Sequence, residues 1–364
     1  MSILACEGID SLTMHELISG WNFQPAEREQ NHLSYFPPCA QAVELYRRTG
    51  PHNRGRSLSL DADQVGLQAI LRQHGFSVPS LNEVEVYNPS LTFNVRGVAH
   101  IVGRVEGSAK NAEHESVSVI FKQVGEKWIP LPSPTFELQD FRVTWIRGQM
   151  LGAGVETKPN PTHKGWVDYR MAFYTGKDIQ SLTHAFDGPW GMKGVNVAEL
   201  SDHQLGIYTR PQGMVGGAGQ IGFTIVDSFD ELARDSVNIM ANAPLLGTRF
   251  PDGEWGGVNQ VLPLADGRNF VVGHRAYRDE HGKRHYYPWA FGHDPYTGEV
   301  FDIGILAERR DFPSGRAKAP DLEDVLYTVG IVKVNGQWQL LTGISDTQAG
   351  MIELNRNLVF RKAA

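Results

Sequence analysis

The stretch that decides the fold class is VAHIVGRVEGSAKNAEHESVSVIFKQ, residues 98–123 of this 364-residue chain. It holds two runs rich in Val, Ile and Phe, Val98–Arg104 and Ser116–Gln123, with a polar segment between them. Short runs of β-branched and aromatic residues bounded by turn-forming residues are typical of β-strands, and each run is shorter than a usual helix. The stretch therefore predicts two consecutive strands.

The same pattern of short apolar runs bounded by turn-forming residues continues through the rest of the chain. Comparable runs recur between Gly, Asn, Asp and Pro clusters, and one helical pattern, Asp230–Asn242, interrupts them. Spacing of about 8–12 residues predicts an all-β domain and disfavours a doubly wound α/β fold. A propeller of four-stranded blades, a sandwich and a jelly roll all fit this pattern. The further predicted strands are 91–93, 141–146, 166–174, 204–210, 221–226, 269–275, 285–291, 325–334 and 338–342.

The first 80 residues differ, because their pattern is helical in pieces. Thr13–Trp21, Ala40–Arg48 and Asp61–His74 predict short helices, with Asp61 as the N-cap of the last. We therefore expect a helical or irregular N-terminal extension, residues 1–80, and a β domain, residues 81–364. The expected apolar stripe of the third helix is Val65, Leu67, Ile70 and Leu71, and Gly75 is expected to end it.

Charge and cysteine content restrict the class of protein. A formal net charge of −7 argues against nucleic-acid binding by phosphate neutralisation. The first residues lack a basic segment followed by an apolar one, and no apolar run approaches the roughly 20 residues that span a bilayer. The chain has two cysteines, Cys6 and Cys39. They could form one disulfide, but a single pair does not indicate the disulfide framework of a secreted protein. We expect a cytoplasmic protein without nucleic-acid or membrane partners.

Two motifs suggest cofactors that their context does not support. Gly217–Gly222 matches G-x-G-x-x-G, but the residues after it predict a strand, and a dinucleotide site needs a helix there. His274, His281, His285 and nearby His293 do not have the spacing of a common zinc motif. A sugar or phosphate contact by His274 or His285 is favoured over a metal site, and a structural role explains these histidines comparably well. We therefore expect neither a metal ion nor a cofactor.

Carboxylates at strand ends are the candidates for glycosyl-transfer chemistry, which needs an acid to protonate the departing oxygen. Asp140 interrupts two apolar strand pieces, and Asp346 follows the predicted strand 338–342. For any one of these residues, a turn cap or a surface charge is the competing explanation. A further acidic group, Asp321, Glu323 and Asp324, precedes another predicted strand.

Aromatic and basic residues near the predicted loops suit a sugar with an anionic group. A pyranose ring stacks on aromatic planes, and Arg and Lys bind phosphate. Core packing and ordinary surface charge account for most of these residues equally well. The aromatic candidates are Trp190, Trp255, Tyr286, Tyr287 and Trp289, and the basic ones are Lys193, Arg210, Arg275, Arg309, Arg310, Arg316 and Lys318.

An ordered set of motifs across roughly residues 81–358 resembles the family of dual-activity β-1,2-mannosyltransferases and mannoside phosphorylases, formerly a domain of unknown function. Leu138–Arg142 is also similar to the Glu-Asp-Pro-Arg acid motif of the related inverting β-mannoside phosphorylases, and Gly343–Thr347 to their Gly-Ala-Ala-Asp-Thr. The other motifs are Tyr87–Ser90, Val102–Glu106, Thr209–Gly213, Trp255–Asn259, Arg284–Tyr287 and Pro320–Val325.

The resemblance implies a five-bladed β-propeller with its site at the central opening and Asp140 as general acid. It implies an oligosaccharide or sugar phosphate as substrate, and it is compatible with a homo-oligomer. Phosphate would attack the face opposite the departing sugar, and a sugar hydroxyl can relay the proton. The implied substrate contacts are Asn88, Arg104, Trp255, Asn259, Tyr286, Asp324 and Asp346. The implied phosphate contacts are Lys193, Arg210, His285 and Lys318.

The chain departs from the family pattern at Gly194, Asn196, Ala218 and Ala319, where charged residues are usual. Such losses suit a hydrolase that uses water, or a different sugar donor. A hydrolase would need a second carboxylate about 6.5–9.5 Å from Asp140. A non-catalytic sugar-binding propeller is the other alternative.

Overall fold

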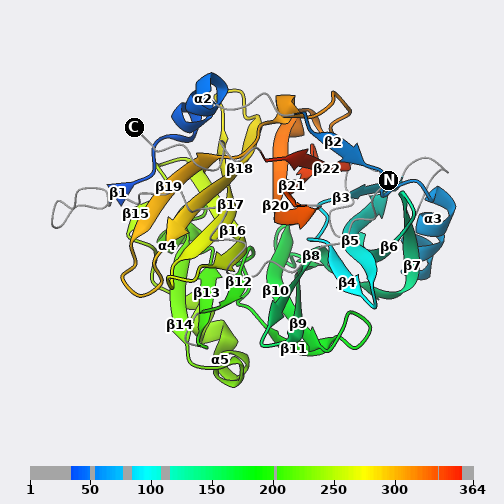
Figure 1. Ribbon diagram of the computed structural model, residues 1–364, viewed down its shortest axis with the longest axis horizontal. Coiled ribbons are helices and arrows are strands. Elements are labelled where there is room, and N and C mark those ends of the chain that lie inside the picture. The colour runs from blue at the N-terminus through cyan, green and yellow to red at the C-terminus, as the bar shows by residue number, and fades with distance from the viewer. Residues whose placement is uncertain are drawn as a thin grey trace.

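The computed structural model describes residues 34–49, 54–76, 84–107, 115–200, 203–334 and 336–354. Strands make up most of this part of the chain, which confirms the predicted all-β class (Figure 1). The expected helix 13–21 and Cys6 lie outside the described residues. No helix in the described part is long and apolar enough to cross a membrane.

The N-terminal segment holds two helices and two short strands: β1 (Ser34–Tyr35), α2 (Cys39–Thr49), β2 (Arg56–Leu58) and α3 (Gln64–Gln73). Both helices confirm the sequence prediction. The N-cap of α3 is Asp63 rather than Asp61, because the Asp63 side chain accepts a hydrogen bond from the Gly66 amide. Val65 was wrongly placed in the apolar stripe, since it is exposed while Leu67, Ile70 and Leu71 are buried.

Two antiparallel sheets follow. The first pairs β5 with β3, β4 and β6, and β6 with β7. The second has the order β11-β10-β9-β8. The strands are β3 (Val84–Tyr87), β4 (Phe93–Val95), β5 (Val98–Gly107), β6 (Ser116–Val124), β7 (Lys127–Phe136), β8 (Gln139–Ile146), β9 (Gln149–Pro159), β10 (Val167–Gly176) and β11 (Thr183–Asp187).

The third sheet has the order β12-β13-β14 and carries the short helix α4 (Gly213–Gly216) and then α5 (Phe229–Ala241). β14 begins at Gly222, so the glycine motif precedes a strand as predicted. The strands are β12 (Asn196–Glu199), β13 (Leu205–Thr209) and β14 (Gly222–Val226).

The last strands form one eight-stranded sheet in two halves, joined by a two-residue parallel pairing of β18 with β20. The N-terminal strand β2 pairs with β22 and completes the second half. A two-residue strand, β15 (Thr248–Arg249), pairs separately with β1. The strands are β16 (Glu254–Pro263), β17 (Asn269–Arg278), β18 (Arg284–His293), β19 (Val300–Ile305), β20 (Asp324–Val334), β21 (Gln337–Ile344) and β22 (Gln348–Glu353). Two short 3-10 helices are η1 (Arg309–Asp311) and η2 (Pro320–Leu322).

Five apolar clusters hold the sheets together, and each joins neighbours in the chain order. Phe141 packs with Phe136 between the first two sheets, and Val155 with Val197 between the second and third. Phe223 packs with Val271, and Leu262 with Leu340, at the next two boundaries. The fifth cluster joins β20–β22 to the first sheet and α3. The last group of strands therefore packs on the first.

Candidate active site

Asp140 lies near the start of β8, where the pairing with β9 is irregular. Its backbone has a φ of 51°, and its carboxylate is partly open to solvent. The amide nitrogen of Asn88 donates to Asp140 Oδ1 at 3.1 Å, and an Arg104 nitrogen lies 3.6 Å from the same oxygen. Gly343 leaves room for Asn88, because a Cβ there would stand 2.0 Å from Asn88 Oδ1. Three predicted residues, Asn88, Arg104 and Asp140, thus meet.

A fully buried carboxylate, Glu106, lies behind this acid. Arg104 donates to Glu106 Oε2 at 3.0 Å, and the Tyr87 hydroxyl donates to Oε1 at 2.6 Å. The Lys318 ammonium contacts the same Oε1 and lies 3.2 Å from the Tyr87 hydroxyl. One buried carboxylate therefore fixes two cations beside the candidate acid.

Asp346 belongs to the same group of charges. It lies in the turn after β21 with a φ of 53°. Burial raises the pKa of Asp346 above its ordinary value, the nearby Arg104 lowers it, and Asp140 raises it. Two carboxyl groups thus share one region with Arg104 and Lys318, and the net effect is a raised pKa of Asp346.

Arg210 forms the cationic side of the site. It follows β13, and its side chain is 7% exposed. Three glycines allow it this close packing, since a Cβ on Gly194, Gly219 or Gly257 would lie within 3.3 Å of its side chain. Its Nε has no hydrogen-bond partner within the described residues, and burial lowers the pKa of Arg210. A buried guanidinium without a counter-charge is a ready anion site.

Neutral polar groups surround this guanidinium. His274 Nδ1 lies 2.8 Å from Asn259 Oδ1, and its ring stacks on Tyr286 at 5.8 Å. Trp255 Nε1 donates to the Tyr286 hydroxyl at 2.9 Å. Burial, and then the charges of Arg210, Arg142 and Lys193, hold the pKa of His274 well below its ordinary value. Because Asn259 Oδ1 only accepts, the neutral ring carries its proton on Nδ1 and leaves Nε2 as an acceptor.

Lys193 and Tyr169 border the same region. The Lys193 ammonium lies 5.1 Å from the centre of the Tyr169 ring. The Tyr169 hydroxyl donates to Gln212 Oε1 at 2.7 Å, and Gln212 Nε2 donates to the Ala218 carbonyl. This chain of contacts ties β10 to the loop that follows Arg210.

Arg142 connects the acidic and cationic sides. Its guanidinium donates to the carbonyl oxygens of Val195, Val258 and Asn259, which belong to other sheets. Burial and then Asp140 raise the pKa of Tyr327, and the charge of Arg142 opposes this rise. Burial and then the charges of Arg210 and Arg142 lower the pKa of His274. A cavity of about 110 Å³ lies along Arg142 and Asn259, with neither Asp140 nor Arg210 in its lining. Arg142 is therefore the charge that acts on both sides.

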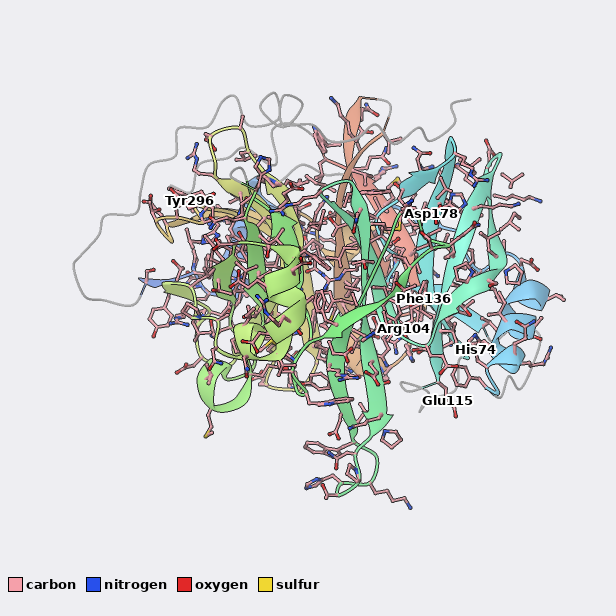
Figure 2. The ribbon with its side chains drawn as sticks, turned by 90° about the horizontal axis from the view of Figure 1, so that it is seen from below. His74, Arg104, Glu115, Phe136, Asp178 and Tyr296 are labelled. Carbon is pink, nitrogen blue, oxygen red and sulfur yellow. The ribbon has the colours of Figure 1, made fainter. Side chains whose placement is uncertain are left out.

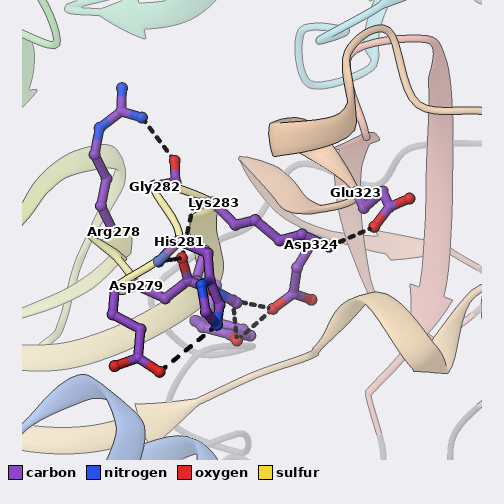
Figure 3. A network of polar contacts seen from close by, with 10 residues as sticks. Arg278, Asp279, His281, Gly282, Lys283, Glu323 and Asp324 are labelled. Atoms are coloured by element: carbon purple, nitrogen blue, oxygen red, sulfur yellow. Dashed lines mark hydrogen bonds and ion pairs between the residues drawn. The ribbon is translucent and has the colours of Figure 1, made fainter.

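His285 and Asp324 occupy a different position. His285 Nδ1 lies 2.7 Å from Asp324 Oδ2, and its Nε2 lies 3.3 Å from Asp279 Oδ2. Figure 3 labels Asp279 and Asp324 within this network of polar contacts. Successive strand residues point to opposite faces, so His285 and Tyr286 point away from each other. The His285 ring also stacks on Tyr277 at 4.6 Å. It is His274 rather than His285 that adjoins Arg210.

Other basic candidates make structural contacts. Arg275 is fully buried against Glu254, Arg309 donates to Ser345, and Arg310 and Arg316 pair with Glu308 and Glu85. The histidines are also separate, since His293 bonds to Tyr208 and His281 is exposed. Within the described part of the chain, no group of three or more His, Cys, Asp or Glu is placed to hold a metal ion.

Residues 66–358 match the model of a family described as a protein of unknown function, DUF1861. The chain belongs to this family. Comparison with curated protein sequences found no match. A mannose phosphorylase from Leishmania mexicana, solved with a phosphate ion, is 27% identical, with a TM-score of 0.73 over 87% of this chain and 93% of its own.

A GDP-Man-dependent mannosyltransferase from Leishmania mexicana is 26% identical, with a TM-score of 0.71 over 88% of this chain and 95% of its own. A β-1,2-mannobiose phosphorylase from Listeria innocua is 14% identical, with a TM-score of 0.52 over 78% and 94%, so this likeness concerns the fold alone. These similarities confirm the family resemblance drawn from the ordered motifs.

Sequence reasoning did not assign a role to Glu106, Tyr169 or Arg142. Glu106 closes one of the ordered motifs, and Arg142 closes another, so their positions carried a signal. No such signal marks Tyr169 in the sequence, because its contact partner Gln212 lies 43 positions away.

Proposed function

We propose that this chain is an inverting carbohydrate-active enzyme that cleaves or builds β-mannosides, or closely related glycosides, with phosphate as the attacking or departing group. The observation that carries the proposal is Arg210, a buried guanidinium that pairs with no carboxylate among the described residues. Arg142 lies near enough to both sides of the site to act on the pKa of His274 beside Arg210 and, together with Asp140, on that of Tyr327. A hydrolase has no phosphate to bind, so a buried cation without a carboxylate partner in the described part of the chain favours the phosphate-dependent reaction.

The proposed architecture is a five-bladed β-propeller. The blades would be β3–β7, β8–β11, β12–β14, β16–β19 and β20–β22, with β2 as the outer strand of the last. The five apolar clusters, of which one joins the last group of strands to the first, support a closed ring. We keep residues 1–80 as an extension and residues 81–364 as the proposed catalytic domain, with β2 bridging them.

In the proposed reaction, a phosphate oxygen attacks the anomeric carbon on the face opposite the departing sugar. The bond from that carbon to the glycosidic oxygen breaks, and the new carbon–oxygen bond has inverted configuration. Asp140 supplies the proton that ends on the departing oxygen, directly or through a sugar hydroxyl. Asn88 and Arg104 hold the Asp140 carboxyl in place.

The cationic side would hold the phosphate. Arg210 supplies a planar fork and Lys193 a point charge. Neutral His274 can accept a hydrogen bond at Nε2, which suits a protonated phosphate oxygen or a sugar hydroxyl. Asp346 and Asn259 would bind sugar hydroxyls, and Trp255 and Tyr286 would contact a ring face.

Lys318 and the pair His285–Asp324 remain proposed contacts with a narrower role. Lys318 touches Glu106 and would attract a substrate anion from the acidic side. His285 and Asp324 would fix the start of β18, the strand that carries Tyr286.

The test is incubation with manno-oligosaccharides with and without phosphate. We expect sugar 1-phosphate to form only when phosphate is present, and Asp140→Asn to lower the rate by at least about a hundredfold. Release of free sugar without phosphate would favour the hydrolase instead. Sugar binding by both the wild type and Asp140→Asn, with no turnover by either, would favour a non-catalytic sugar-binding protein.

A further inference from the structure

The β9–β10 hairpin extends past the sheet to which it belongs. Gln139 of β8 pairs with Val155 of β9, and the last four β9 residues pair only with β10. We call residues 156–170 the arm. Figure 2 shows it projecting beyond the other strands, on the side opposite Asp178.

The arm rises from the same end of the sheet as the candidate acid. Asp140 lies at the start of β8, and β9 is antiparallel to β8, so β9 ends on that side. At its base, Tyr169 bonds to Gln212 in the loop after Arg210. The arm is therefore continuous with the border of the proposed phosphate site.

The tip of the arm is an ordered turn that presents one aromatic residue. The Asn160 side chain accepts hydrogen bonds from Thr162 and His163 and donates to Asp168 at 2.7 Å. The Asn160 backbone N–H donates to the Trp166 carbonyl oxygen at 2.8 Å. Trp166 is 70% exposed, and its ring lies 5.6 Å from that of His163.

The geometry points to a distal sugar subsite at Trp166, which binds an oligosaccharide remote from the bond that is cleaved. This inference rests on the proposed function and adds to it a residue, Trp166, that binds a sugar unit away from the reacting bond. An exposed indole stacks on the apolar face of a pyranose ring, while Thr162, His163 and Lys164 offer polar groups to the hydroxyls.

The surroundings of Trp166 favour a sugar over a protein partner. Its neighbours in the turn are Thr162, His163, Lys164 and Gly165, and all of them are polar or small and exposed. A stable protein interface needs about 800 Å² per partner with an apolar centre. The next exposed indole along the chain, Trp190, lies at the base of the arm, where Lys158 and Arg170 contact its ring. The tip thus offers one indole among polar groups, which does not supply such a centre but covers one sugar ring.

The reach of the arm sets the expected chain length. Trp166 lies three positions beyond Tyr169, which borders the phosphate site. At about 3.3 Å per residue this places the indole roughly 10 Å beyond Tyr169 along the arm. A sugar unit spans about half that distance, so the subsite would take the second or third unit from the cleaved bond.

The experiment compares manno-oligosaccharides of two to six units with wild-type protein and Trp166→Ala. For the wild type, we expect kcat/KM to rise with length and to level off at four units. For Trp166→Ala, we expect about a three- to tenfold loss for the longer substrates and none for the disaccharide. Trp145→Ala is the matched control, because Trp145 is 47% exposed at the opposite end of β8.

A binding measurement separates this inference from the proposed reaction. Calorimetry with Asp140→Asn, with and without Trp166→Ala, reports affinity for the tetrasaccharide without turnover. Loss of affinity on Trp166→Ala supports the subsite even if no β-mannoside is turned over. The inference is overturned if the affinity for the tetrasaccharide is the same with and without Trp166→Ala, or if the tetrasaccharide does not bind at all. A change of oligomeric state on Trp166→Ala would also overturn it.

Discussion

Replacing Arg210 by Met should stabilise the protein and remove its response to phosphate. The wild-type guanidinium is buried, and its Nε has no partner in the described part of the chain. Leaving such a group unsatisfied costs about 1–3 kcal/mol, and more where the group is charged. Met fills a similar volume without this cost, so the free energy of unfolding should rise by about 1–3 kcal/mol.

The stabilisation that phosphate gives to the wild type should be lost in Arg210→Met. A ligand at a hundred times its Kd stabilises the folded state by about 2.7 kcal/mol. Urea denaturation with and without phosphate at constant ionic strength measures both quantities. We expect phosphate to raise the unfolding midpoint of the wild type and leave that of Arg210→Met unchanged.

Arg147→Met provides the control. Arg147 is partly exposed just after β8, at the end opposite Asp140, and its Nε lies 3.9 Å from Glu199. Its loss should change stability by less than about 1 kcal/mol and preserve the phosphate response. The reasoning fails if Arg210→Met unfolds more easily than the wild type and still gains stability from phosphate.

Three further predictions concern charge, pH and chain closure. Glu106→Gln leaves Arg104 and Lys318 without their shared carboxylate, so the free energy of unfolding should fall by about 3–5 kcal/mol, and an unchanged urea midpoint would contradict the pairing. Burial lowers the pKa of His293 to about 4, so the unfolded state binds the extra proton between that pH and about 6.5. Stability should therefore fall by roughly 3 kcal/mol from pH 7.5 to 4, and His293→Gln should flatten this slope in urea titrations. Removal of residues 1–60 takes away β2 and exposes the edge of β22, so this shortened chain should aggregate in sedimentation tests where the full chain does not.

The strands that the sequence predicted are those with continuous β-branched and aromatic runs, such as β5, β6 and β20. β7 was missed because Pro130, Pro132 and Pro134 interrupt its pattern, although its pairing with β6 is irregular and tolerates them. β9 was missed because Gly152 and Gly154 weaken its pattern. These glycines are needed, since a Cβ at either would collide with Phe141 or Leu138.

The candidate site was predicted as a set of residue types rather than as an arrangement. Ordered motifs were enough to name Asp140, Arg104 and Asn88, which the structure brings together. The sequence offered His274 and His285 as alternative sugar or phosphate contacts. That His274 is the one beside Arg210 depends on which face of its strand each residue occupies, and the sequence did not show this. The sequence also did not show that Glu106 is fully buried. Because it is buried, its carboxylate fixes the positions of Arg104 and Lys318.

The pairing of β2 with β22 also has a consequence for synthesis of the chain. Ser57 and Gln348, at this junction, are hydrogen-bonded to each other across a separation of 291 positions. At about 5–20 residues per second, β2 leaves the ribosome roughly 15–60 s before its partner strand exists. Until then Leu60 and the apolar faces of α3 and the first sheet lack the side chains of Leu341 and Met351 that complete their cluster. The packing of β20–β22 on the first sheet can therefore form only after nearly the whole chain has been made, and the first strands are exposed for the longest time.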